Sequence, residues 1–215
     1  MDEHSNFADW FHAMMQFQDE DGRRRVTARR DRLSALFSLA SSVKHLPGCT
    51  AECGVFKGAS SYLIVAATRT AYSLHYCFDS FQGLSTPQKE DFVPEKDDAY
   101  WMAGKFAIDL EYVTRALDAF RYDIAILPGW IPTRFAEVTA ERFSFVHIDV
   151  DFFEPTRDSI AFFYPRMIKG GIVLFDDYDS PRCPGARKAI DAFLAGKPQK
   201  IVPLSPLQSA YLKFE

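Results

Sequence analysis

The chain contains 215 residues, of which 47% are hydrophobic, enough for the core of one domain but too few residues for two full α/β domains. Its 25 basic and 29 acidic residues give a net charge of -4, which excludes bulk attraction to nucleic acid or anionic membranes, so a small-molecule partner is expected. The four cysteines form no C-x-x-C pair, no apolar core of signal-peptide length begins the chain, and no run approaches about 18 apolar residues. We therefore expect reduced thiols, no membrane contact and a cytoplasmic protein.

Apolar residues at helical spacing predict two helices at the start of the chain, at residues 7–17 and 27–43, and Pro47-Gly48 ends the second. Short β-rich runs then alternate with helical patterns. Strands are predicted at 49–53, 73–78, 124–127, 145–149, 171–177, 200–204 and 209–214, and helices at 60–68, 98–120, 155–164 and 185–194. This alternation predicts an α/β fold with a doubly wound, mostly parallel sheet of about seven strands. The last two strands are expected to form an antiparallel hairpin at the sheet edge.

One long irregular stretch, residues 83–94, interrupts the pattern. Long loops inside compact domains are usually lids or binding segments, and a surface excursion without function is the alternative.

Two of the predicted strands finish in carboxylates. Asp149 follows one apolar run, and Asp176 and Asp177 follow the next. Ligands of parallel sheets gather outside the carboxyl ends of the strands, so the three side chains are expected at one spot. Close carboxylates repel one another unless a cation neutralises them, which favours a hard divalent metal; a capped turn is the alternative for the Asp176-Asp177 pair.

A turn with two glycines, Gly54 and Gly58, follows the first strand. Glycine lets a ligand approach the backbone, and the helix that begins near Ser60 offers unpaired N–H groups. The spacing E-x-G-x-x-x-G, which begins at Glu52, is not the G-x-G-x-x-G of dinucleotide sites. Alone, the glycine pair is equally typical of an ordinary tight turn.

The second strand ends in Asp79, 25 positions beyond Gly54 (79 minus 54). An acid at this point suits the two hydroxyls of a ribose, so turn and acid together indicate an adenosine-containing ligand. Ser80 is a further candidate contact, and helix capping is the alternative role for this pair. After the third strand, Gly129 and Trp130 could hold an adenine face, unless Trp130 packs into the sheet edge.

Five motifs follow one another in order between about residues 46 and 195: Glu52-Cys53-Gly54-Val55, Phe78 to Leu84, Gly129 to Pro132, His147 to Thr156, and Asp176 to Ala189. Together they resemble the TylF/macrocin O-methyltransferase family. The resemblance implies a single-domain, Rossmann-like class I methyltransferase at residues 46–215, which uses S-adenosylmethionine and Mg²⁺ to methylate a hydroxyl, commonly on a sugar of a natural product. Residues 1–45 would form a helical segment on the substrate or oligomer side, and a homodimer is expected.

Carried over by position, Glu52 and Gly54 would meet the methionine moiety, Asp79 the ribose, and the three acidic strand ends the metal. A bound cation lowers the pKa of an oxygen ligand, and Mg²⁺ with three Asp ligands leaves positions for two adjacent oxygens of an acceptor diol. Asp149 is the candidate base. Asp151 is expected to be a supporting group, and His147 a packed strand residue. Two alternatives stay open: an N- or catechol-type methyltransferase of the same fold, and a non-catalytic binder of an adenosyl ligand.

Overall fold

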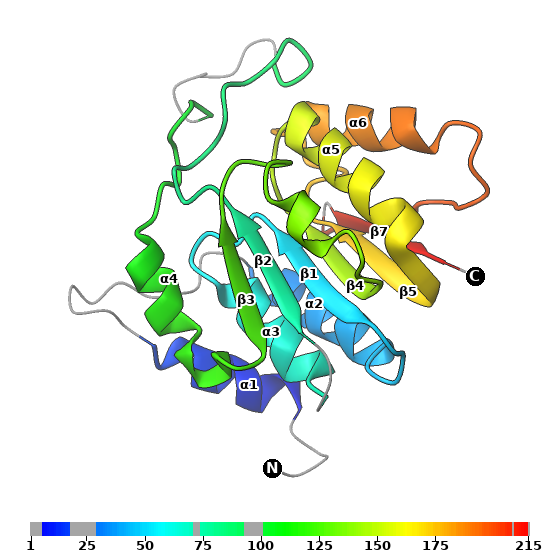
Figure 1. Cartoon of the computed structure of the whole chain (residues 1–215). Coiled ribbons are helices and arrows are strands. Elements are labelled where there is room, and N and C mark those ends of the chain that lie inside the picture. Colours follow the sequence, from blue (N-terminus) through cyan, green and yellow to red (C-terminus); the bar gives the residue numbers. More distant parts are fainter. Residues whose placement is uncertain (1–5, 18–28, 71–73, 93–100, 208, 215) are drawn as a thin grey trace.

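The computed structural model describes residues 6–17, 29–70, 74–92, 101–207 and 209–214. Its centre is a seven-stranded sheet in the order β3-β2-β1-β4-β5-β7-β6 (Figure 1). The first five strands run parallel to their neighbours, and the last two are antiparallel. Their bounds are β1 Cys49–Cys53, β2 His75–Asp79, β3 Ile124–Pro128, β4 Phe143–Ile148, β5 Met167–Phe175, β6 Val202–Leu204 and β7 Ser209–Lys213.

Helices cover both faces of the sheet (Figure 1). One face carries α1 Phe7–Met15, α2 Arg30–Ser42, α3 Ala59–Thr68 and α4 Leu110–Ala116; the other carries α5 Phe153–Phe163 and α6 Pro184–Leu194. Short 3-10 helices lie at Asp118–Phe120, Phe135–Val138 and Tyr164–Arg166. None of these helices, within the described residues, is long and apolar enough to cross a membrane.

Side chains alternate between two hydrophobic clusters along the strands. Phe145 of β4 and Leu174 of β5 pack with α1 to α4, whereas Val146 and Val173 pack with α5 and α6. Successive strand residues point to opposite faces, so strands buried on both sides need continuous apolar sequence, as β4 and β5 have. The result is the doubly wound architecture that the sequence predicts.

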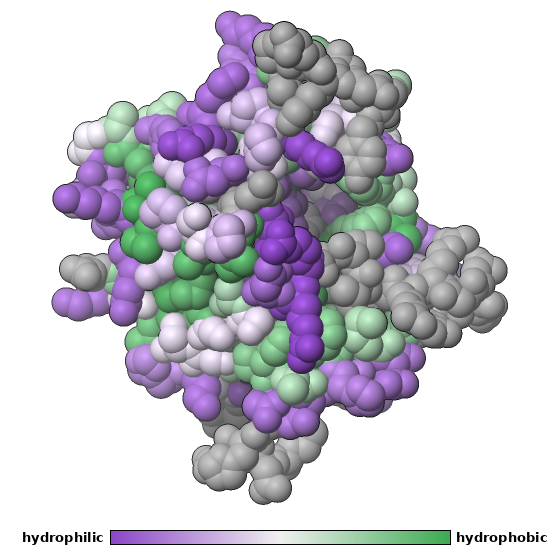
Figure 2. Space-filling model, turned by 180° about the vertical axis from the view of Figure 1, so that it is seen from behind, coloured by the Kyte–Doolittle hydropathy of each residue, from purple (hydrophilic) through white to green (hydrophobic). Residues whose placement is uncertain are grey.

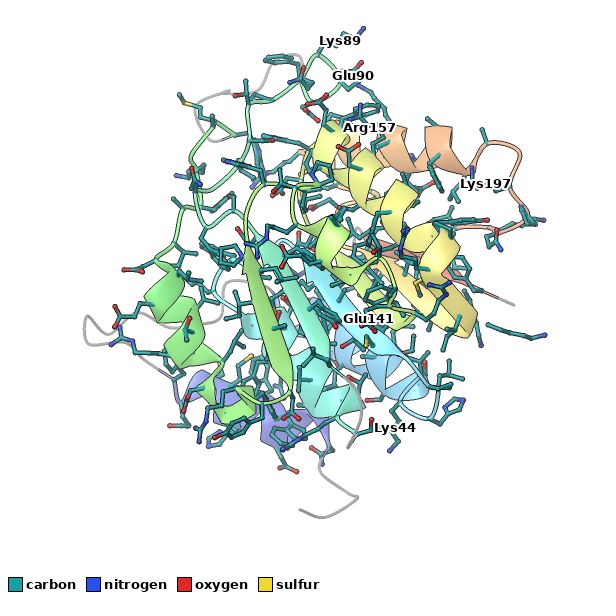
Figure 3. The ribbon with its side chains drawn as sticks, in the orientation of Figure 1. Lys44, Lys89, Glu90, Glu141, Arg157 and Lys197 are labelled. Carbon is teal, nitrogen blue, oxygen red and sulfur yellow. The ribbon has the colours of Figure 1, made fainter. Side chains whose placement is uncertain are left out.

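Charged side chains lie on the surface at both ends of the sheet (Figure 3). Lys89 and Glu90 lie beyond the carboxyl ends of the parallel strands, on the same side as the first turn of α5, where Arg157 is found, and Lys44 lies at the opposite end (Figure 3). Seen from behind, hydrophilic and hydrophobic residues lie side by side (Figure 2).

The seven predicted strands are confirmed, including the antiparallel hairpin of β6 and β7, and every predicted helix but one lies within a few residues of its expected place. The exception is the helix predicted at 98–120, which is wrong over 101–109. Those residues form turns and extended chain, and α4 begins only at Leu110, where the Asp109 side chain accepts the N–H of Glu111 (2.9 Å). Residues 93–100, like 18–28, lie outside the described part of the chain.

Candidate active site

A cavity of about 660 Å³ opens at the carboxyl ends of the parallel strands. The strand order reverses between β1 and β4, and such a switch point leaves a crevice for a ligand. Predicted site residues that line this cavity are Gly54, Asp79, Ser80, Trp130, Asp149, Asp176 and Asp177.

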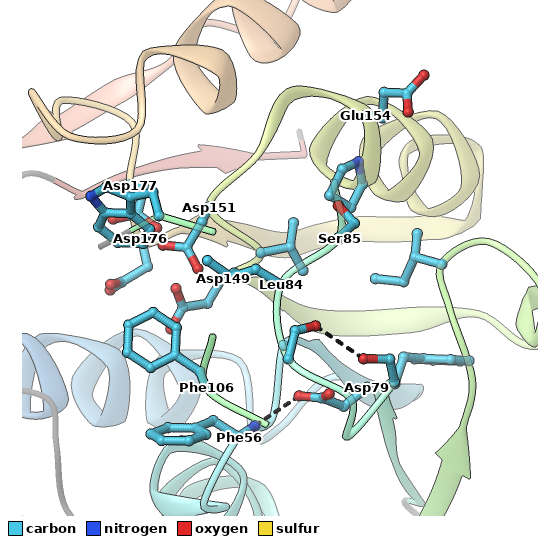
Figure 4. A pocket seen from close by; sticks show the side chains of 18 of the residues that line it. Phe56, Asp79, Leu84, Ser85, Phe106, Asp149, Asp151, Glu154, Asp176 and Asp177 are labelled. Atoms are coloured by element: carbon cyan, nitrogen blue, oxygen red, sulfur yellow. Dashed lines mark hydrogen bonds between the residues drawn. The ribbon is translucent and has the colours of Figure 1, made fainter. Parts of the chain in front are cut away.

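Parallel pairing brings the acidic strand ends together. Ile148 of β4 pairs with Phe175 of β5, and the N–H of Asp176 donates to the Ile148 carbonyl (3.1 Å), so Asp149 and Asp176 emerge side by side. Ligand atoms of Asp149, Asp176 and His147 lie within 4.8 Å of one another, and those of Asp177, Asp151 and Cys183 form a second such group. Figure 4 shows the four aspartates converging on one side of the cavity.

Burial makes this cluster electrostatically costly. Burial first, and then the charges of Asp176 and Asp177, hold the pKa of Asp149 well above its ordinary value. Burial likewise raises the pKa of Asp151 to about 6 and that of Asp177 well above its usual range. A cation among these carboxylates would relieve both the desolvation and the repulsion.

One cation of the chain already lies there. Arg32, on the first turn of α2, donates through Nη1 to Oδ2 of Asp176 and through Nε to the carbonyl of Leu207 (2.8 Å). It lines the cavity together with Arg29 and Arg182. The Arg32 guanidinium therefore connects α2 with the end of β5 and with the turn between β6 and β7.

Asp79 organises the turn after β1. Its Oδ2 accepts the N–H groups of Val55 and Phe56 (both 2.8 Å), and its Oδ1 accepts that of Phe81 (2.7 Å), as Figure 4 shows in part. Burial raises the pKa of Asp79 although these bonds lower it. The carboxylate thus ties the ends of β1 and β2 together at the rim of the cavity.

Gly54 is required by a close approach of two backbones. Its φ is 88°, and a Cβ at this position would lie 1.7 Å from the carbonyl oxygen of Asp149. Any side chain would push β1 away from the end of β4 and so displace Asp149.

Glu52, which the resemblance assigns to the methionine moiety, is not among the residues that line the cavity. Glu52 is fully buried, accepts from Nδ1 of His147 (2.7 Å) and is hydrogen-bonded to Ser61. Burial opposes ionisation of Glu52, but His147, His75 and Ser60 together outweigh burial, so its pKa is lowered. Nε2 of His147 is buried, has no hydrogen-bond partner among the described residues and lies 4.0 Å from Oδ1 of Asp176. Glu52 therefore contacts His147, a residue that adjoins Asp176.

Three other residues that the sequence predicts for the site lie at the margin of the cavity. Gly58 is the N-cap of α3, and Ser60 lines a smaller adjoining cavity of about 60 Å³ together with Arg32, His147 and the turn after β1. Gly129 is not among the residues that line either cavity, although its neighbour Trp130 is, and Trp130 is 38% exposed. Trp130 is therefore not packed into the sheet edge.

An aromatic wall, formed by Phe56, Trp101 and Phe106, lines part of the same cavity. Phe106 contacts Phe56 and Trp101 edge to face, with centroids 5.6 and 5.9 Å apart. Phe56 and Phe106 have φ values of 46° and 67°, and Asp151 has 60°, in the left-handed region that non-glycine residues rarely adopt. Such strain concentrates at functional sites, where the surrounding structure enforces it.

A loop region that we call the lid, defined as residues 83–92 and 101–108, contributes Gly83, Leu84, Ser85, Trp101 and Phe106 to the cavity wall. Its two arms are joined by hydrogen bonds from Leu84 N–H to the Lys105 carbonyl (2.8 Å) and from Gly104 N–H to the Leu84 carbonyl (2.9 Å). Asp91 anchors it to the N-terminus of α5, through Phe153 N–H (2.7 Å). The described part of the irregular stretch predicted from the sequence, residues 83–92, is thus held by hydrogen bonds, and Gly83, Leu84 and Ser85 line the cavity.

The sequence did not point to Arg32, Phe56 or Phe106. Arg32 stands in a basic stretch that looks like a solvated helix face, and only tertiary packing reveals its ion pair. The one available signal for Phe56 was its place inside the turn after β1.

Comparison with known proteins agrees with this geometry. The sequence model of the family described as Macrocin-O-methyltransferase (TylF) matches residues 21–204. The chain is 28% identical over 146 residues to 8-demethyl-8-(2,3-dimethoxy-alpha-L-rhamnosyl)-tetracenomycin-C 4'-O-methyltransferase of Streptomyces olivaceus, covering 64% of this chain and 56% of that protein. It is 26% identical over 159 residues to demethyldecarbamoylnovobiocin O-methyltransferase of Streptomyces niveus, covering 70% of this chain and 60% of that protein. The chain thus spans less than two thirds of these relatives.

Solved structures show the same fold. A calicheamicin methyltransferase superposes with a TM-score of 0.73 at 25% identity, covering 86% of this chain and 80% of that one. The O-methyltransferase NovP also gives 0.73, at 21% identity, with coverages of 95% and 88%. The fold is therefore the Rossmann-like α/β fold of class I methyltransferases, and the chain belongs to the macrocin O-methyltransferase (TylF) family.

Proposed function

We propose that the protein transfers a methyl group from S-adenosylmethionine to a hydroxyl of a small molecule, a sugar or another diol of a natural product, with the help of Mg²⁺. The observation that carries the proposal is that Asp79 and the acidic strand ends open on one cavity. A ribose-type acid and a cation-type cluster on the same cavity suit a reaction between an adenosyl donor and an acceptor held at a metal.

The donor would lie along the turn after β1. Asp79 would bind the ribose hydroxyls, Trp130 and Ser80 would border the adenine, and Gly54 would let the methionine part approach the backbone. The smaller adjoining cavity, with Ser60 and the N-terminus of α3 in its wall, suits the methionine end. Gly129 and Gly58 would shape the loops, and Glu52 would support His147 from beneath.

The residues present fit a divalent cation. Asp149 and Asp176 offer oxygens within 4.8 Å of each other, and Asp177 and Asp151 belong to a second such group that lines the same cavity. The raised pKa values of Asp149 and Asp177 express a deficit of positive charge. Carboxylate oxygens are the donors that Mg²⁺ prefers, so we assign it to Asp149, Asp176 and Asp177. When bound, it would lower the pKa of an acceptor hydroxyl beside it.

Asp149 is the base in this proposal. Its carboxylate oxygen would accept the proton of the acceptor hydroxyl. The aromatic wall would hold the apolar face of the acceptor ring, and the lid would exclude water. Two relatives whose names specify 4'-O- and 3''-O-methylation support a sugar hydroxyl as the acceptor class.

The test is methyl transfer to a panel of diol-bearing glycosides, with product detected by the mass gain of one methyl group. We expect turnover to disappear with a chelator and to return with MgCl₂, and Asp149→Asn to abolish it. Asp179→Asn is the matched control, because Asp179 pairs with Arg187 (2.6 Å) and does not line the cavity.

Other outcomes identify the alternatives. Methylation of an amine or a catechol in place of a sugar diol would mean an N- or catechol-type enzyme. Binding of S-adenosylmethionine without any transfer, and unaffected by Asp176→Ala, would indicate a non-catalytic binder. Turnover that survives complete metal removal would refute the Mg²⁺ assignment. The homodimer and the cytoplasmic location belong to the same proposal, and the mass in solution tests the first.

A further inference from the structure

Arg32 lies where a cation is needed. It is the third residue of α2, yet its side chain reaches the far end of β5, where Nη1 donates to Oδ2 of Asp176. The side chains of both partners are mostly buried, 17% and 16% exposed. The hydrogen bond from Nε to the Leu207 carbonyl (2.8 Å) fixes the guanidinium from a second side.

This ion pair and a divalent cation would use the same carboxylate. Oδ2 of Asp176 is occupied by Arg32, and Oδ1 lies 3.4 Å from the hydroxyl of Ser209 and 4.0 Å from Nε2 of His147. A cation held by Asp149 and Asp176 would lie close to the guanidinium, and two positive charges in a partly buried site repel each other strongly. The divalent cation and the Arg32 guanidinium therefore compete for the Asp176 carboxylate.

The reach of the Arg32 charge extends beyond Asp176. Burial raises the pKa of Asp151 and Asp177, and the Arg32 charge works against that increase at both residues. The Arg32 charge thus acts on Asp151 and Asp177 as well as on Asp176.

We propose that Arg32 is a built-in counter-ion of the acidic cluster, which a divalent cation must displace from Asp176. Arg32 therefore weakens cation binding and links occupancy of the site to α2 and to the turn between β6 and β7. This inference rests on the proposed cation site, and it makes Arg32 a positioning residue of that site.

A neighbouring arginine provides a matched control. Arg29 lines the same cavity, but its guanidinium pairs with Asp31, and the two side chains are 64% and 45% exposed. Arg29→Gln and Arg32→Gln each remove one positive charge from the cavity wall, and only the second removes a competitor for Asp176.

The experiment is calorimetric titration of the full chain with MnCl₂ alone, without donor or acceptor. We expect Arg32→Gln to lower the Kd about tenfold, a usual size for coupling between two sites, and Arg29→Gln to leave it within about twofold. A Kd that is unchanged or higher in Arg32→Gln would overturn the inference. No MnCl₂ binding by the wild type or by Arg32→Gln would instead mean that the proposed cation site is wrong.

A second measurement titrates the wild-type protein, in case Arg32→Gln does not fold. The arginine Nε–H signals are followed by NMR during titration with MgCl₂, with Arg32→Lys and Arg29→Lys to assign them. The Arg32 signal should shift along the binding curve as its contact with Asp176 is lost, and the Arg29 signal should stay in place. A stationary Arg32 signal at saturating MgCl₂ would contradict displacement.

Discussion

Asp91 accepts a hydrogen bond from the backbone N–H of Phe153, 62 positions along the chain (2.7 Å). Its other oxygen accepts the N–H of Gln88 (2.8 Å), so one carboxylate stabilises both a turn of the lid and the first turn of α5. Gly185 makes room for it, since a Cβ there would lie 1.8 Å from Oδ1 of Asp91. The lid, α5 and α6 therefore meet at one side chain, next to the loop that carries Asp149 and Asp151.

Asp91→Ala should loosen the lid. Two backbone N–H groups lose their acceptor, which costs about 1–2 kcal/mol of unfolding free energy, in line with loss of a helix cap. We expect faster hydrogen exchange at Gln88 and Phe153 and a higher KM with a smaller change in kcat. Glu90→Gln is the control, because Lys188 binds the Glu90 backbone carbonyl and not its side chain. Equal effects of the two substitutions would contradict an anchoring role for Asp91.

Asp79→Asn should separate folding from donor binding. The amide keeps one acceptor oxygen but places an NH₂ group against backbone N–H donors, so we expect a loss of about 1–3 kcal/mol of unfolding free energy. At a temperature where the variant is folded, we expect S-adenosylmethionine binding to fall at least tenfold, an order of magnitude typical of one lost charge-assisted hydrogen bond. Calorimetry measures it. The affinity should fall less in Ser80→Ala, which loses the hydrogen bonds of the Ser80 hydroxyl with Gln82 and Gly83. Normal affinity in folded Asp79→Asn would exclude the ribose contact.

The strand ends were predictable because β4 and β5 are apolar runs that stop abruptly at acids, and parallel pairing then fixes where those acids meet. The failed helix prediction has an equally local cause. Trp101 and Phe106 supply apolar residues in the stretch before α4, and in the structure both face the cavity instead of a helix interface. Apolar spacing alone cannot distinguish a ligand-facing wall from a packed helix.

The contacts that sequence reasoning missed are long-range. Glu52 and His147 are register partners on β1 and β4, so a correct strand order would have placed the acid beside the histidine. Even then, the motif alone did not reveal that Glu52 is fully buried. The pair of Arg32 and Asp176 spans 144 positions and depends on how α2 packs, which no local pattern encodes.

His75 should make stability depend on pH. Burial, and to a smaller extent His147, lower its pKa to about 4, although Glu52 opposes the shift. The unfolded chain has a His pKa of about 6.5, so between these values it binds more protons than the folded protein, and stability is lost as pH falls. The expected loss from about pH 7 to about pH 5 is roughly 2 kcal/mol from this group alone.

Urea unfolding at both pH values measures this effect. His75→Asn, which can still bond to Thr50, should remove that part of the pH dependence, because the variant has no imidazole to protonate. His45→Asn changes an exposed histidine and should retain the wild-type pH dependence. If His75→Asn also retains the wild-type pH dependence, groups other than His75 cause it.

Asp177→Asn should make the cation-free protein more stable and abolish its response to Mg²⁺. Burial, followed by the charges of Asp151 and Asp176, raises the pKa of Asp177, so at neutral pH its ionised form costs folding free energy. Because the pKa of Asp177 is higher in the folded than in the unfolded protein, its protonation stabilises the fold, and this contribution is lost as pH rises through the folded-state pKa. Removing the charge should therefore add about 1 kcal/mol to the free energy of unfolding near pH 7. The same substitution removes a proposed ligand of the cation.

Thermal unfolding of Asp177→Asn should therefore show a higher Tm than wild type without cation and no further increase with MgCl₂. Asp179→Asn, which breaks an exposed pair with Arg187, should show neither change. A lower Tm for Asp177→Asn in the absence of cation would mean that the acidic cluster is not under repulsion, and the case for a cation at this site would lose its physical basis.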